Sequence, residues 1–188
     1  AYIVINEVSA SLKPLYTAYE NNPDYPERLF LNSAEALELA DESSMVVVVD
    51  TNRPGMTECE ELLHVAKTIV VLDHHRQSSD NIDNALLSYI EPYASSACEM
   101  VSEVLQYIVD DIKIPNLEAS SLYAGIMIDT NNFMNKTGVR TFEAAAFLRR
   151  SGADITLVRK MFRDDMESYR AKAQIISSAE AVSYTHLT

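Results

Sequence analysis

Positive charge is scarce in this sequence. It contains 15 lysine and arginine residues against 28 aspartate and glutamate residues, which gives a formal net charge of −13 at pH 7. A domain this acidic repels nucleic-acid backbones, so the composition argues against a duplex nucleic-acid partner. Bound divalent cations reverse the field at one spot, so a small phosphorylated substrate held on metal ions is not excluded.

Long apolar runs and cysteines are also few. No apolar stretch approaches the roughly 18 residues that a membrane-spanning helix needs. The two cysteines, Cys59 and Cys98, do not stand in a C-x-x-C spacing, which predicts free thiols in a reducing compartment rather than a zinc site. The serine-hydrolase pattern G-x-S-x-G and internal repeats are absent from the printed sequence, so neither a nucleophilic serine elbow nor a repeat fold is indicated.

Two short apolar runs end abruptly in polar side chains. Residues 45–49 (MVVVV) are followed by Asp50, and residues 69–72 (IVVL) are followed by Asp73-His74-His75. Such β-branched runs are typical of strands buried on both faces, and those belong to parallel sheets. Because parallel sheets carry their chemistry at the carboxyl ends of the strands, both runs predict a functional edge.

The rest of the chain alternates strand and helix patterns and then becomes helical. We predict an α/β fold, a parallel β-sheet flanked by helices and followed by a helical half, as one domain over residues 1–181. The predicted strands are 2–6, 28–31, 45–50, 68–73 and 86–90. The predicted helices are 9–20, 33–40, 56–66, 96–109, 116–129, 141–151, one capped by Asp154, and 166–181.

Local signals define several helix ends. Ser33 is the expected N-cap of its helix, Ser96 and Glu99 form a capping-box pair, and Asn116 is expected to cap the long helix. Gly152 is expected to close the helix before it. Residues 182–188 match the translation of a common sequencing adaptor, so we expect an artefact there, and we expect natural residues to precede Ala1.

Three positions in the sequence are candidates for metal-binding or catalytic residues. Asp50 after a strand can be a turn or helix cap, and Asp129 after the apolar run 124–128 can be a cap or a ligand. The triplet Asp73-His74-His75 is harder to explain without a bound partner, because imidazoles and a carboxylate at a buried strand end are costly to desolvate. Carboxylate oxygens with a minority of imidazole nitrogens suit Mn²⁺ or Mg²⁺, and two such ions activate water against a phosphoester.

These motifs, in this order, resemble the DHH phosphoesterase superfamily. The segments 91–99 and 137–142 are further similar to the membrane-anchored cyclic-di-AMP phosphodiesterases of Gram-positive bacteria. The resemblance implies two Mn²⁺ ions, with Mg²⁺ possible, and Asp50, His74 and Asp129 as metal ligands, Asp50 bridging. It implies catalytic roles for His75, at the scissile phosphate or behind the ligands, and for Asp73, which would orient a histidine.

The same resemblance sets expectations for the parent protein. It implies cleavage of cyclic-di-AMP to linear pApA, a cytoplasmic catalytic domain anchored in the cell membrane, and a homodimer. The family's first motif, His-x-x-x-Asp-x-Asp at the end of the first strand, and its C-terminal substrate domain are missing here. We therefore expect the isolated fragment to be inactive or nearly so.

Three residues are weaker candidates for substrate binding, and other functions stay open. Ser95 and Ser96 could meet a phosphate at a helix N-terminus or simply cap the helix, and Arg140 could bind a phosphate or lie on the surface. The alternatives to a cyclic-dinucleotide phosphodiesterase are a DHH oligoribonuclease or dinucleotide phosphodiesterase, a manganese pyrophosphatase, and a non-catalytic regulatory module.

Overall fold

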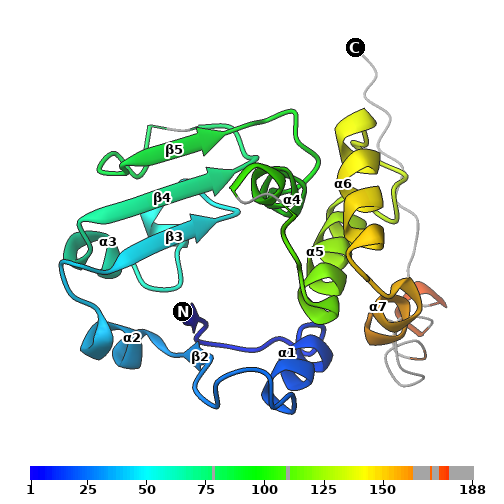
Figure 1. Cartoon of the computed structure of the whole chain (residues 1–188), viewed down its shortest axis with the longest axis horizontal. Coiled ribbons are helices and arrows are strands. Elements are labelled where there is room, and N and C mark those ends of the chain that lie inside the picture. The colour runs from blue at the N-terminus through cyan, green and yellow to red at the C-terminus, as the bar shows by residue number, and fades with distance from the viewer. Residues whose placement is uncertain (78, 109–110, 163–169, 171–173, 178–188) are drawn as a thin grey trace.

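The strands that the structure describes form two parallel sheets. The computed structural model describes residues 1–77, 79–108, 111–162, 170 and 174–177. In this part of the chain a small sheet pairs two strands, and a larger sheet has the order β3-β4-β5 (Figure 1). The parallel sheet flanked by helices confirms the predicted fold class. The strands are β1 (Ile3–Val4), β2 (Phe30–Leu31), β3 (Met45–Val49), β4 (Thr68–Asp73) and β5 (Leu87–Ile90).

The helices divide into a group beside the strands and a group after them. The helix α4 packs on β4 and also contacts α5 and α6, so it joins the helical half to the larger sheet (Figure 1). The first group is α1 (Lys13–Glu20), α2 (Ser33–Leu39), the 3₁₀ turn η1 (Pro54–Met56) and α3 (Leu62–Val65). The second is α4 (Ala97–Ile108), α5 (Asn116–Asp129), α6 (Val139–Arg150) and α7 (Ile155–Met161).

One hydrophobic core lies under the larger sheet and another lies in the helical half. They hold β4 and α5, the elements that end in the polar residues Asp73 and Asp129. Under the larger sheet, Ile69 and Val71 of β4 are buried against Leu63 and Ile82. In the helical half, α5 and α6 pack through small and branched side chains, among them Ile126 and a run of alanines. Burial of these apolar surfaces is what fixes the sheet edge and the end of α5 in space.

The prediction that residues 45–49 are buried on both faces is wrong. Val48 is buried, but Met45, Val47 and Val49 are 64%, 53% and 49% exposed. Within the described part of the chain β3 pairs with β4 alone, so it is an edge strand of the larger sheet. The continuous apolar run therefore describes a strand with one uncovered face.

Several predicted helix boundaries also need correction. Asn32, and not Ser33, is the N-cap of α2, because its side chain accepts a hydrogen bond from the backbone of Glu35 while Glu35 bonds back to Asn32. Pro115, without a side-chain hydrogen bond, stands at the cap of α5 in place of Asn116.

The helix predicted over 56–66 is reduced to η1 and the single turn α3. The Thr57 hydroxyl bonds to the Pro54 carbonyl and closes η1, and Thr57 itself is extended, so the chain leaves the helical conformation there. Asp154 caps α7 as expected, and Gly152 has a φ of 104° after α6. Most of the predicted helix 166–181, and the tail 182–188, lie outside the described residues.

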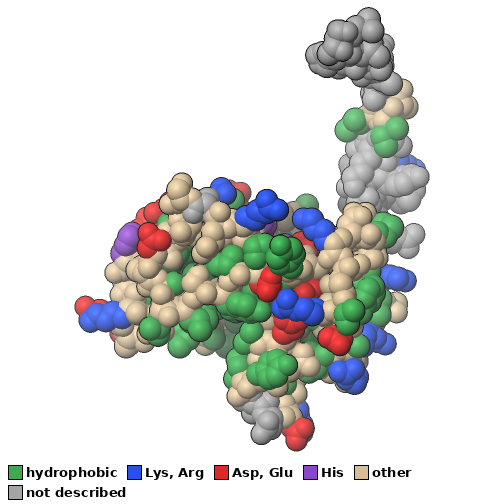
Figure 2. All heavy atoms as spheres, turned by 90° about the horizontal axis from the view of Figure 1, so that it is seen from above, with side chains coloured by type: hydrophobic (Ala, Val, Ile, Leu, Met, Phe, Trp, Pro, Cys, Tyr) green, Lys and Arg blue, Asp and Glu red, His purple; other side chains and the backbone are tan. Residues whose placement is uncertain are grey.

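The visible surface mixes the two signs of charge. Figure 2 shows Asp and Glu side chains interspersed with Lys and Arg side chains and with hydrophobic side chains on the face that it presents. Among the described helices, each is too short or too polar to cross a membrane.

Candidate metal centre at the sheet edge

Three predicted ligands converge at the carboxyl edge of the larger sheet. The Nε2 atom of His74 lies 3.2 Å from Oδ1 of Asp50 and 4.0 Å from Oδ2 of Asp129. The His74 side chain is 11% exposed, whereas those of Asp50 and Asp129 are 57% and 36% exposed. The imidazole is therefore held against the protein while the two carboxylates face solvent beside it.

The fold explains why residues far apart in sequence meet here. β3 and β4 run parallel in register, with Val49 opposite Leu72, so Asp50 and His74 follow strands that end together. Asp50 has a φ of 66°, a left-handed conformation that costs energy for a residue with a Cβ, and its N–H donates to the Leu72 carbonyl at 3.0 Å. Asp129 is the last residue of α5, which α4 ties to the sheet.

Asp73 does not join the ligands but holds the second histidine. Its side chain is fully buried, and its Oδ1 lies 2.8 Å from Nδ1 of His75 and accepts the His75 backbone N–H at 3.1 Å. A carboxylate in this position can accept a hydrogen bond from a protonated Nδ1, an arrangement that would leave the lone pair on Nε2. The side chain of His75 is 59% exposed, so this nitrogen is open to a partner.

The donor set suits a hard divalent cation. One ligand atom each of Asp50, His74 and His75 lie within 4.8 Å of one another, with Asp129 beside His74. Carboxylate oxygens combined with imidazole nitrogens fit Mn²⁺ or Mg²⁺ better than a structural zinc site, which favours thiolates. The residues present thus form a possible metal-binding group.

The electrostatics show that the carboxylates of this site repel one another. Burial raises the pKa of Asp129, and the nearby carboxylate of Asp50 raises it further, while His74, His75 and Lys136 oppose the shift. Burial, followed by the charges of Asp129 and Asp50, also raises the pKa of the Cys98 thiol to about 12. A bound cation would relieve the repulsion between the two carboxylates.

The weaker candidates are engaged within the protein. Ser95 and Ser96 are buried; the Ser95 hydroxyl donates to the Glu99 carboxylate, and the Ser96 hydroxyl accepts the Glu99 backbone N–H. These contacts favour the helix-cap interpretation of both serines. The guanidinium of Arg140 forms two hydrogen bonds of 2.6 and 2.7 Å with Glu103, at 41% side-chain exposure, so a phosphate would have to compete with a carboxylate there.

Sequence reasoning missed Asn52. Its side chain is 3% exposed, and its amide donates to Oδ2 of Asp73 at 2.5 Å. The available signal was its position two residues after Asp50, in the loop that leaves β3 at the functional edge.

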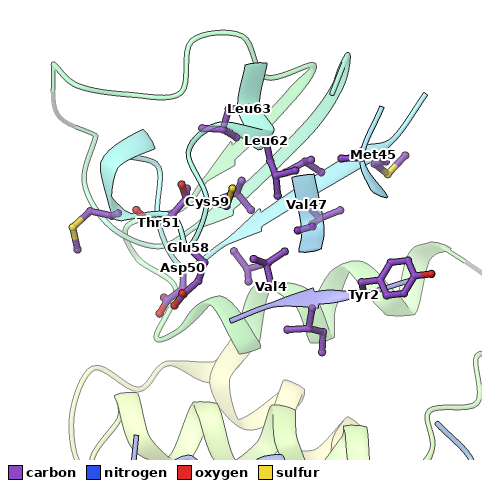
Figure 3. Close-up of a pocket in the computed structure, with 18 of the residues that line it drawn as sticks. Tyr2, Val4, Met45, Val47, Asp50, Thr51, Glu58, Cys59, Leu62 and Leu63 are labelled. Carbon is purple, nitrogen blue, oxygen red and sulfur yellow. The ribbon is translucent and has the colours of Figure 1, made fainter. Parts of the chain in front are cut away.

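A large apolar groove separates the two sheets and ends at the candidate metal centre. It has a volume of about 1160 Å³ and is lined by residues of β1, β3 and the segment around α3. In Figure 3, β1 and β3 point the same way on opposite sides of the groove, with Val4 and Val47 between them and Asp50 at the end where both arrows finish.

Comparison with known proteins identifies the family. The profile described as "DHH family, N-terminal domain" matches residues 3–126. The chain belongs to the DHH family. Its DHH triplet is therefore Asp73-His74-His75, the segment that the structure places at the carboxyl end of β4.

Two relatives of known description are similar to most of this chain. The chain is 46% identical over 145 residues to the cyclic-di-AMP phosphodiesterase GdpP of Geobacillus thermodenitrificans, covering 77% of this chain and 22% of that protein. It is 38% identical over 182 residues to the cyclic-di-AMP phosphodiesterase PdeA of Listeria monocytogenes, covering 96% of this chain and 28% of that protein. The chain thus spans about a quarter of the length of these DHH-family relatives.

The solved structure supports the fold. An exopolyphosphatase-related protein from Bacteroides fragilis superimposes with a TM-score of 0.77 at 17% sequence identity, over 96% of this chain and 53% of that one. The two named relatives are both described as cyclic-di-AMP phosphodiesterases.

Proposed function

We propose that this chain is the metal-binding part of a phosphodiesterase that cleaves cyclic-di-AMP to linear pApA. The observation that carries the proposal is the convergence of Asp50 and Asp129 on the Nε2 atom of His74, at 3.2 and 4.0 Å. The names of the relatives from Geobacillus and Listeria support the choice of substrate.

Each residue has a proposed role. Asp50, His74 and Asp129 would hold two Mn²⁺ ions, with Asp50 as the carboxylate shared between them. When bound, such a pair of ions supplies hydroxide at neutral pH and neutralises the charge of the phosphate. His75 contacts the scissile phosphate through the nitrogen that Asp73 leaves free, and Asp73 keeps the imidazole in place.

The groove supports a further part of this proposal. The edge of β3 and that of β1 flank a space of about 1160 Å³ with apolar walls, and both strands point toward Asp50. A strand inserted parallel to both would join the two sheets into one. Its carboxyl end would then lie beside Asp50, where the family resemblance requires the His-x-x-x-Asp-x-Asp ligands.

The isolated chain is therefore expected to be inactive or nearly so. The printed sequence contains no His-x-x-x-Asp-x-Asp motif, and it matches only 22% and 28% of the length of the two named relatives, so we propose that further metal ligands and nucleotide contacts come from outside these 188 residues. A membrane anchor and a homodimer in the parent protein remain proposals that rest on the resemblance.

The decisive experiment restores the missing parts. Residues 1–181 are joined to the flanking segments of Listeria PdeA, and turnover of cyclic-di-AMP is measured with excess Mn²⁺. The longer chain should hydrolyse cyclic-di-AMP, with the isolated chain more than about 100-fold slower. Asp50→Ala should abolish turnover, whereas the exposed-site control Asp83→Asn should not change it.

Other outcomes would select another function. Turnover of pApA or short RNA without cyclic-di-AMP would favour the oligoribonuclease alternative, and turnover of pyrophosphate alone would favour a pyrophosphatase. A folded longer chain that binds Mn²⁺ but cleaves none of these substrates would contradict an enzymatic role and favour a regulatory module.

A further inference from the structure

A buried amide lies directly behind the DHH triplet. Asn52 is 3% exposed, and its Nδ2 donates to Oδ2 of Asp73 at 2.5 Å and approaches the His75 carbonyl at 3.5 Å. The backbone carbonyl of Asn52 accepts a hydrogen bond from the Ile82 backbone N–H at 2.9 Å, and this bond fixes the loop that carries Asn52. The amide thus links the loop after β3 to the end of β4.

The contacts of Asp73 are divided between two partners. One carboxylate oxygen faces the amide of Asn52, and the other faces the Nδ1 and backbone N–H of His75. The opposite amide orientation would set two acceptor oxygens against each other, so the donor must face Asp73. With one oxygen held by Asn52, the carboxylate cannot rotate away from the imidazole.

The chemistry of an amide suits this position. An amide donates a hydrogen bond without adding charge, so the full negative charge of Asp73 stays directed at His75. A lysine or arginine there would neutralise the carboxylate and weaken its hold on the imidazole. The Oδ1 atom of Asn52 is buried without a hydrogen-bond partner in the described part of the protein, a cost that a purely structural loop residue would be expected to avoid.

We propose that Asn52 is a positioning residue, which clamps Asp73 so that His75 stays in the Nδ1–H form with Nε2 free to face the metal and phosphate site. The part that concerns phosphate rests on the proposed function; the clamp itself does not. In water the Nε2–H form of neutral histidine is favoured, so the opposite form is a distinctive signature of the clamp.

The direct test is the nitrogen NMR of His75 in the 188-residue chain. Histidine is labelled with ¹⁵N, divalent ions are removed, and the pH is set at about 8.5, where an ordinary imidazole is neutral. His75 is assigned by loss of its signals in His75→Gln. The wild-type ring should be in the Nδ1–H form, and Asn52→Leu should shift the population toward Nε2–H, as should Asp73→Asn.

A matched control separates positioning from loop structure. The Asn84 side chain also bridges loops, but it donates its hydrogen bond of 2.7 Å to the Leu63 carbonyl and not to the triplet. Asn84→Leu should leave the His75 signals unchanged even if it lowers stability. In the longer chain described above, Asn52→Leu should lower kcat by about 10–100-fold with little change in KM.

The outcomes are distinguishable from failure of the proposed function, because the NMR measurement needs no substrate. If His75 of the wild-type chain is in the Nε2–H form, the clamp hypothesis is wrong. This result needs no variant, so the hypothesis can be tested even if Asn52→Leu folds poorly. Unchanged His75 signals in a folded Asn52→Leu, or in Asn52→Ala, overturn it too. A tautomer shift in an inactive longer chain would support the clamp and contradict the phosphodiesterase.

Discussion

Asp129 sits where its negative charge is unfavourable in the absence of a cation. Burial and Asp50 raise the pKa of this carboxyl, so the folded state holds the Asp129 proton more tightly than the unfolded state does. The contribution of such a group to stability is greatest below its unfolded pKa and is lost as the pH rises through the folded value. At neutral pH the ionised Asp129 therefore lowers the stability of the metal-free protein.

Asp129→Asn should consequently stabilise the metal-free protein. In EDTA at about pH 7, its free energy of unfolding in urea should exceed that of the wild type by less than about 1 kcal/mol, since the side chain is partly exposed. The difference should narrow as the pH falls toward the ordinary aspartate range. Asp83→Asn, on the exposed surface, should show no such pattern.

With added Mn²⁺ the wild type should become more stable than Asp129→Asn, the reverse of the order expected in EDTA. A ligand at 100 times its Kd stabilises the native state by about 2.7 kcal/mol, and the wild type should gain more than Asp129→Asn. Equal stabilisation of both proteins by Mn²⁺ would remove Asp129 from the metal shell.

The site residues differ in how far the sequence could predict them. Asp50, His74 and Asp129 each lie at or just after the end of an apolar run, so their positions at the ends of elements were visible in the sequence. The closeness of Asp50 and His74 follows from parallel strands, whereas that of Asp129 depends on the packing of α5. Asn52 was not visible, because an asparagine after a strand is normally a turn residue. Only tertiary contact with Asp73 distinguishes it.

At the scale of elements, the approach of α4 and α5 sets the distance between the sheet and Asp129. A Cβ added to Gly125 of α5 would lie 2.2 Å from Sγ and 3.1 Å from Cβ of Cys98 in α4. The helices are therefore in contact at a position where one has no side chain. A larger residue must push them apart or displace the thiol.

Gly125→Ala should destabilise the protein although alanine is the better helix former. The gain in helix propensity is at most about 1 kcal/mol, whereas overpacking costs about 1–3 kcal/mol. Urea unfolding should report a lower free energy of unfolding. Gly55→Ala, with its nearest neighbour at 3.9 Å, should be nearly neutral.

A double variant identifies the clash as the cause. Removing the thiol in Cys98→Ala makes room, so Cys98→Ala with Gly125→Ala should be more stable than the sum of the single effects, by about 1 kcal/mol or more. Additive losses would mean that the cost arises elsewhere in the helix pair.

Elements with strong local patterns were predicted well, and those decided by tertiary context were not. β4 was predicted at its observed bounds because its run is apolar and meets the core. The 56–66 segment has helix-forming residues, yet Thr57 closes η1 and shortens the helix to one turn. The exposure of Val47 could not be read from its sequence, since the run is as apolar as that of β4.

At the scale of the whole molecule, the groove divides a sheet that the sequence predicted as continuous. β1 and β2 stand apart from β3, β4 and β5, and the apolar side chains of β3 face the gap. If a strand of the parent protein fills it, the same side chain should contribute little to the isolated chain and much to the longer one.

Matched substitutions on the paired strands β3 and β4 test whether a strand of the parent protein fills the groove. Val→Thr keeps the shape but adds a hydroxyl, which costs about 1–3 kcal/mol when buried without a partner. In the isolated chain Val71→Thr, at a fully buried site, should incur this cost, whereas Val47→Thr, at 53% exposure, should change the free energy of unfolding by less than about 0.5 kcal/mol. In the longer chain Val47→Thr should become as costly as Val71→Thr, because the inserted strand covers it. An effect of Val47→Thr that stays small in the longer chain, measured by the same urea titration, would mean that the groove remains open and that the missing ligands reach Asp50 by another route.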